Sequence, residues 1–156
     1  MTVILSFDPS SNKAVASNTG VVLIDNGKLI NHWCLPYGVD GIRKWYAEEF
    51  GKIRYDKVIF EHFEARDNSK AKDNSPLETI AEIKRLIPAA EGVRNGGYST
   101  DVPNELLKAL GLWKFKKSHH QDIRASARLA LFYAMRNDLE DFVNGVGELL
   151  SESFQG

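Results

Sequence analysis

The sequence contains a single cysteine, Cys34, so no disulfide can form within the chain and a cysteine-based zinc site is disfavoured. No apolar run approaches the roughly 20 residues that span a bilayer. The first residues, 1–5, carry no basic segment of the kind that begins a secretory signal. Internal repeats are also missing. We therefore expect one domain over residues 1–156, with no membrane association and in the cytoplasm.

Lysine and arginine are missing from the last 20 residues, 137–156, which contain five acidic residues. The rest of the chain holds all 20 basic residues against 16 acidic ones, although the formal charge of the whole chain is −1. Residues 138–156 are thus expected to form an acidic C-terminal helical segment. This composition is typical of a solvated surface, and a nucleic-acid surface would require that the basic residues be clustered.

The basic residues are in fact clustered between Lys108 and Arg128, where Asp122 is the only acidic residue. Trp113 and Phe115 interleave with the lysines of this cluster. Lys and Arg side chains contact phosphates, and the counterions that they release supply much of the affinity for DNA. The pattern favours nucleic-acid binding, for which the expected contacts are Lys114, Lys116, Lys117, His120, Arg124 and Arg128.

Apolar periodicity predicts an ordered alternation of strands and helices. Asn26-Gly27 separates two apolar runs and is the strongest short signal for a hairpin. The order of elements indicates an α/β fold, with a mixed five-stranded sheet flanked by helices. The expected strands are 3–8, 19–24, 29–35, 57–63 and 98–102, and the expected helices are 41–50, 77–86, 103–110, 118–135 and 139–150.

Two carboxylates follow apolar strands of this predicted sheet. Asp8 ends the first strand, and Glu61 comes after Val-Ile-Phe in the strand at 57–63. A right-handed crossover would make these two strands parallel, and ligands bind at the carboxyl ends of parallel strands. Burying a lone carboxylate is costly unless it is paired or binds a metal. Each acid alone is explained as a strand-end residue in solvent, whereas the pair indicates a site.

A third cluster of polar residues lies at the start of the helix predicted over 118–135. Ser118 and Gln121 fit a capping box, which places His119 and Asp122 in the first turn, on one face. His and Asp together can hold a divalent cation. The helix dipole alone also accounts for an acid at this position, so the cluster by itself leaves both interpretations open.

Taken together, the motifs resemble those of RNase H-like nucleases. Asp8-Pro9-Ser10 followed by Thr19-Gly20 is similar to the opening of that fold, and the Val58–Glu61 segment is similar to its fourth strand. His119-x-x-Asp122 resembles the last-helix motif of the RuvC-like Holliday junction resolvases. Ser10 departs from the glycine that is usual in the family, and His119 stands where many members have aspartate. Phage-encoded members have a similar length, so a phage origin is expected.

The resemblance implies two magnesium ions, for which Mn²⁺ would substitute, a homodimer, and paired nicking of four-way and other branched DNA junctions. Asp8, Glu61, His119 and Asp122 would be the catalytic and metal-binding residues, with Glu64 as a further candidate. Arg66, Lys70 and Lys72, in the polar loop after the Glu61 strand, would contact the DNA. The dimer would form through Ile80, Ile83 and Ile87, or through the apolar stripe at 139–150.

Three other functions fit parts of the sequence. A nuclease of the same fold could cut RNA–DNA hybrids, because the motifs do not encode substrate preference. A sugar-kinase or actin-like phosphate binder would use the Asp-led loop at 8–13, but such proteins need two domains, and 156 residues are too few. A non-catalytic DNA-binding recombination adaptor would bind junctions without cutting them.

Overall fold

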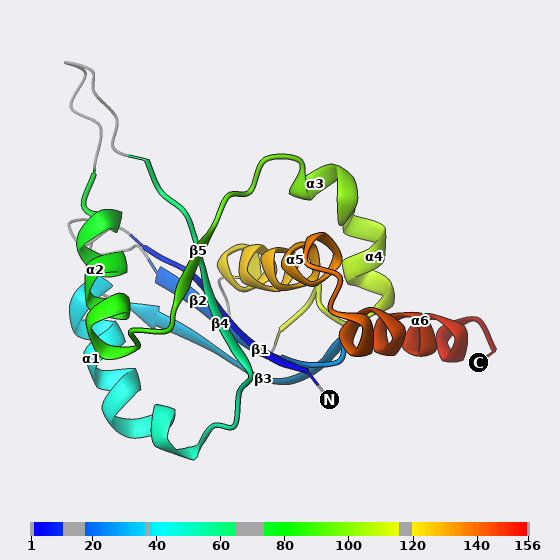
Figure 1. The fold of residues 1–156 in the computed structure, drawn as a ribbon, viewed down its shortest axis with the longest axis horizontal. Helices are drawn as coiled ribbons and strands as arrows, with labels where there is room; N and C mark the ends of the chain where they lie inside the picture. Colours follow the sequence, from blue (N-terminus) through cyan, green and yellow to red (C-terminus); the bar gives the residue numbers. More distant parts are fainter. Residues whose placement is uncertain (1, 11–17, 37, 65–73, 116–119, 156) are drawn as a thin grey trace.

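The computed structural model describes residues 2–10, 18–36, 38–64, 74–115 and 120–155. They form a five-stranded mixed sheet with helices on both faces, in the order β3-β2-β1-β4-β5 (Figure 1). This architecture confirms the fold class predicted from the sequence. The strands are β1 (Val3–Asp8), β2 (Asn18–Asp25), β3 (Lys28–Pro36), β4 (Lys57–Glu61) and β5 (Glu91–Val93).

The central strand β1 is antiparallel to β2 and parallel to β4, as the predicted crossover requires. The predicted hairpin joins β2 to β3 through a two-residue turn. Asn26 and Gly27 have φ angles of 48° and 89°, and positive φ at both turn residues is the signature of the type I′ hairpin. β5 extends the sheet by pairing parallel to β4.

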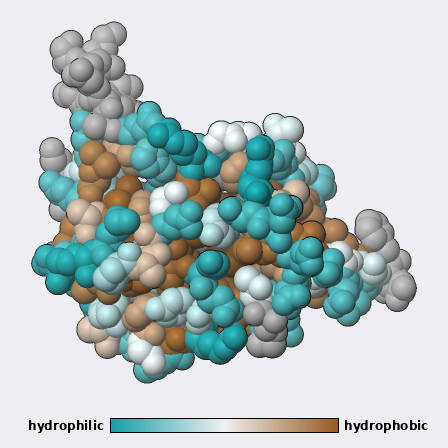
Figure 2. All heavy atoms as spheres, in the orientation of Figure 1, coloured by the Kyte–Doolittle hydropathy of each residue, from teal (hydrophilic) through white to brown (hydrophobic). Residues whose placement is uncertain are grey.

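Helices cover each face of the sheet and enclose two apolar cores. α1 (Gly38–Glu49), the 3-10 turn η1 (Phe50–Lys52) and α2 (Pro76–Leu86) lie over one face. On the other face α5 (His120–Arg136) crosses β2 and β1, and α6 (Glu140–Gln155) lies beside its end (Figure 1). Figure 2 shows apolar residues along the middle of one side of the molecule, within a hydrophilic periphery.

The small-residue face predicted for the helix at 118–135 is confirmed in α5. Ile123, Ala127, Ala130 and Ala134 are fully buried. The three alanine side chains are small enough to let the helix lie close to the sheet, which brings its first turn to the ends of the central strands. The predicted capping residue Ser118 lies outside the described residues.

One prediction about secondary structure is wrong, the position of the fifth strand. The strand expected over 98–102 is the short helix α3 (Tyr98–Asp101), followed by α4 (Asn104–Ala109). The fifth strand is instead β5, whose three residues Glu-Gly-Val are too few to show an alternating pattern. Gly97 precedes α3 with a φ of 85°, a backbone conformation that glycine adopts readily and that turns the chain into the helix.

The isoleucines expected to form a dimer interface are part of the protein's own core. Ile80, Ile83 and Ile87 are at most 9% exposed and pack against the sheet with α1. An interface through them is therefore excluded in this fold. No helix among the described residues is long and apolar enough to cross a membrane.

Candidate metal centre

Asp8 and Glu61 lie side by side at the carboxyl ends of two parallel strands. Asp8 is the last residue of β1 and Glu61 is the last of β4, and the two strands pair in register. Ile4 lies four residues before Asp8 on β1, and Ile59 lies two residues before Glu61 on β4. Both isoleucines belong to the core beneath α5. Since side chains alternate along a strand, both carboxylates project towards α5.

Asp122 reaches the same place because α5 touches the sheet at Gly20. Gly20 pairs with Asp8 across β1 and β2. A Cβ atom built at Gly20 would lie 2.2 Å from the backbone oxygen of Asp122, so only glycine allows this approach. The Ser126 hydroxyl donates a hydrogen bond of 2.6 Å to the carbonyl of Gly20 and fixes the contact. The first turn of α5 is thus held directly beside Asp8.

The three carboxylates interact strongly. Burial raises the pKa of Asp8 well above its usual value, and the hydrogen bond and negative charge of Glu61 and the charge of Asp122 raise it further. Within the described residues, the ion pairs involve neither Asp8 nor Glu61. Negative charge is therefore concentrated at this point, which a bound cation would relieve.

The donor set suits a hard divalent cation, because Mg²⁺ and Mn²⁺ prefer carboxylate oxygens. In the described part of the chain, no three His, Cys, Asp or Glu side chains already stand in metal-binding geometry. Asp8 and Glu61 instead share a hydrogen bond, and that bond must open when a cation enters. His119, the fourth ligand expected from the sequence, lies outside the described residues.

Two residues that the sequence did not single out also reach the site, from the segment between β5 and α3. The Asn95 amide donates a hydrogen bond to Glu61 Oε1. Burial raises the pKa of the Tyr98 hydroxyl, and the nearby charges of Glu61 and Asp8 raise it further. The one sequence signal here is the Gly96-Gly97 pair, which marks a turn without indicating what the turn carries.

Glu64, the additional ligand candidate, points elsewhere. It forms an ion pair with Arg94, and His62 Nε2 lies 3.7 Å from Glu64 Oε1. The hydrogen bond and charge of Arg94 lower the pKa of Glu64, and Glu64 is not among the groups that shift Asp8. These side chains line an open hollow of about 360 Å³, together with Asn95 and Gly96.

The described members of the predicted DNA-binding cluster surround Trp113. The Arg124 guanidinium lies 3.7 Å from the centre of its ring, and Lys108 Nζ lies 4.9 Å from it. Arg124 Nε donates to the Trp113 carbonyl at 2.5 Å. Arg128 donates to the Val102 carbonyl and, at 2.6 Å, to Asn104 Oδ1. Both arginines thus also hold the 98–113 segment against α5.

Two more of the predicted DNA contacts are among the described residues. Lys114 is exposed beside Trp113, and His120 begins α5. The others fall outside the described residues: Arg66, Lys70, Lys72, Lys116 and Lys117.

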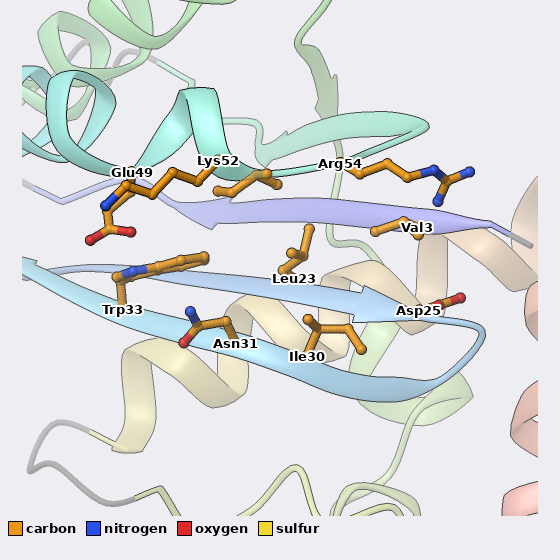
Figure 3. Close-up of a pocket in the computed structure, with 10 residues that line it drawn as sticks. Val3, Leu23, Asp25, Ile30, Asn31, Trp33, Glu49, Lys52 and Arg54 are labelled. Carbon is orange, nitrogen blue, oxygen red and sulfur yellow. The ribbon is translucent and has the colours of Figure 1, made fainter.

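A different hollow, of about 430 Å³, lies at the opposite end of the central strands (Figure 3). Val3 at the start of β1 and Asp25 at the end of β2 line it, together with Trp33 and the basic residues Lys52 and Arg54. The full length of β1 separates it from Asp8. Its lining mixes these basic residues with the acidic Glu49 and Asp25, so it lacks the one-sided charge of the carboxylate cluster.

No protein-family model matches this chain, and no curated protein sequence does. Among solved structures, the fold is similar to "T. thermophilus RuvC in complex with Holliday junction substrate", with a TM-score of 0.62 at 11% sequence identity. The match covers 90% of this chain and 98% of that one. The chain therefore has the RNase H-like fold.

A second structural match is "Structure of Mos1 transposase catalytic domain and Raltegravir with Mn". It covers 96% of this chain and 78% of that one, with 18% identity and a TM-score of 0.32. A score this low does not establish a common fold.

Proposed function

We propose that this protein is a divalent-metal-dependent DNA endonuclease that resolves four-way and other branched junctions by paired nicks. The convergence of Asp8, Glu61 and Asp122 from β1, β4 and α5 carries the proposal. The similarity to RuvC, solved on a Holliday junction substrate, supports junction DNA as the substrate class.

The protein's own groups have defined tasks in this reaction. Asp8, Glu61, Asp122 and His119 would hold two Mg²⁺ or Mn²⁺ ions, which supply an activated water and stabilise the leaving oxygen of the phosphodiester. The carboxyl of Asp8 retains its proton more readily than an ordinary aspartate because burial and Glu61 raise its pKa. Binding of a cation therefore requires this proton to leave, which makes affinity for the metal increase with pH.

A panel of labelled substrates tests the proposal. The protein is incubated in Mg²⁺ with a four-way junction, a replication fork, an RNA–DNA hybrid and linear duplex DNA. Paired nicks in the junction, with little cutting of duplex, are expected. Faster cutting of the hybrid would support a hybrid nuclease instead, and binding to the junction without any cutting would support a non-catalytic adaptor.

The affinity for junction DNA is expected to fall as salt rises, because basic residues of the 108–128 cluster displace counterions from phosphates. Replacing Lys116 and Lys117 with alanine should reduce the slope of log K against log salt by roughly one to two units. Fluorescence anisotropy in Ca²⁺ or EDTA over a salt series gives both slopes. An unchanged slope would remove these lysines from the interface.

The protein is expected to be a homodimer, because two identical sites related by a two-fold axis match the near two-fold symmetry of a junction. The apolar stripe at 139–150, which lies mainly in α6, remains as the candidate interface. Val143 of this stripe is 38% exposed, and the neighbouring Met135 of α5 is 42% exposed. They border an apolar hollow of about 280 Å³ that is also lined by Leu106, Leu131, Phe142, Val146, Gly147 and Leu150.

Sedimentation at micromolar concentration should give a species of twice the 17.5 kDa chain mass. Val143→Asp should shift it towards the monomer. A wild-type protein that sediments as the single chain, with and without junction DNA, would rule out the dimer.

A further inference from the structure

The segment Asn95–Tyr98 forms a tight turn beside the carboxylates. The Tyr98 amide donates to the Asn95 carbonyl at 3.0 Å. Gly97 has φ 85° and ψ −1°, the values of the third residue of a type II turn, where glycine is favoured. The turn brings its first and last residues together, so the Asn95 and Tyr98 side chains stand next to each other at the same end of the sheet.

Both ends of this turn are fixed to the rest of the fold. On the β5 side, the His62 amide donates to the Val93 carbonyl at 2.9 Å and ties the strand end to β4. On the other side, the Tyr98 ring packs edge-on against Phe132 of α5, with 6.4 Å between ring centres. The Arg128 guanidinium lies 5.7 Å from the centre of the Tyr98 ring. The position of Asn95 is thus determined by rigid elements on both sides.

From this position the Asn95 amide donates to Glu61 Oε1, and Asn95 also shares a hydrogen bond with Tyr98. An amide donor stabilises a carboxylate without adding a positive charge that would compete with a cation. It contacts Glu61 Oε1, and the carboxylate can still bind an ion once its hydrogen bond with Asp8 opens. Glutamate has several rotatable bonds, and fixing them in advance reduces the entropy lost when an ion binds.

We propose that Asn95 is a positioning residue that holds the Glu61 carboxylate in place for a divalent cation. The inference rests on the proposed function, since it requires Glu61 to be a metal ligand. Hydrogen-bond partners behind metal ligands typically change metal affinity by 10–100-fold. Asn95 acts through Glu61, and it does not itself touch the DNA or the ion.

Calorimetric titration of the full chain with Mn²⁺, without DNA, tests this role. Asn95→Ala removes the donor, and Asn95→Leu removes it while keeping the branched shape of the side chain. Both variants should bind Mn²⁺ about tenfold more weakly or worse, with thermal unfolding in EDTA close to that of the wild type. Junction cleavage by both variants should be slow at low Mn²⁺ and recover at high Mn²⁺, while the KM for the junction stays unchanged.

Two further variants separate the possible results. Ser99→Ala, at an exposed position four residues along in α3, is the matched control and should bind Mn²⁺ like the wild type. Glu61→Gln should bind Mn²⁺ weakly, and excess Mn²⁺ should not restore its cleavage of the junction. Wild-type affinity in both Asn95 variants, together with a loss in Glu61→Gln, would overturn the positioning role alone. Unchanged affinity in Glu61→Gln would overturn the metal site and the positioning role together.

Discussion

Asp8→Asn is expected to reduce junction cleavage about a thousandfold or more while leaving the fold and DNA binding intact. The substitution keeps the shape of the side chain and removes the charge at the centre of the carboxylate cluster. Bound metal ions supply several kcal/mol of transition-state stabilisation, and about 4 kcal/mol corresponds to a thousandfold in rate. Single-turnover cleavage of a labelled junction in Mg²⁺ measures the loss.

The same variant should be more stable than the wild type in EDTA at neutral pH. Burial and the neighbouring carboxylates raise the pKa of Asp8 in the folded protein. A group whose pKa is raised by folding contributes its stability at low pH and loses it as pH rises through the folded-state pKa. Asparagine resembles the protonated form at every pH, so its advantage should disappear below the ordinary aspartate pKa of about 4.

Urea unfolding at several pH values measures this difference. Asp40→Asn, an exposed substitution in α1, is the control and should retain wild-type cleavage. Cleavage at the wild-type rate by Asp8→Asn would exclude Asp8 from the site. Lower stability of Asp8→Asn at neutral pH without metal would contradict the repulsion within the cluster.

The second large effect is expected from Gly20→Ala, which should destabilise the protein by about 1–3 kcal/mol or more. The new methyl group would overlap the backbone of Asp122, with the Asp122 oxygen 2.2 Å and the Ile123 nitrogen 2.7 Å away. Backbone atoms cannot rotate aside as a flexible side chain can. The start of α5 must therefore move away from β2, which also moves Asp122 away from Asp8. Metal-dependent cleavage should then fall together with the free energy of unfolding.

Gly51→Ala is the matched control for this substitution. Gly51 lies in η1 and is exposed, and a Cβ atom added there would have no neighbouring atom within 4 Å. Alanine at this position should leave cleavage unchanged and stabilise the protein by up to about 1 kcal/mol. Wild-type stability and activity in Gly20→Ala would show that α5 does not need this close contact.

The parts of the site that could be predicted from the sequence depend on local patterns. Asp8 and Glu61 each interrupt an apolar strand, and the crossover rule places these strands in parallel, which the pairing of β1 with β4 confirms. The buried alanines of α5 follow from helical spacing in the same way. These signals are contained within single elements, so one sequence is enough to reveal them.

The parts that could not be predicted depend on contacts between distant segments. Asn95 reaches Glu61 across 34 positions in the chain, through a turn whose geometry the Gly96-Gly97 pair does not specify. β5 has three residues, too few for an alternating pattern to emerge. The Ile80–Ile87 stripe shows an apolar helix face, but the sequence alone cannot tell whether that face meets the protein's own sheet or a second copy.

Cleavage of an end-labelled four-way junction with and without Mg²⁺ tests the central claim most directly. With Mg²⁺, the wild-type protein should produce symmetric nicks in opposing strands, and Asp8→Asn should bind the junction without cutting it. In EDTA, both proteins should bind and neither should cut. Cutting by the wild type in EDTA, or cutting at the wild-type rate by Asp8→Asn in Mg²⁺, would contradict a metal-dependent nuclease site at Asp8, Glu61 and Asp122.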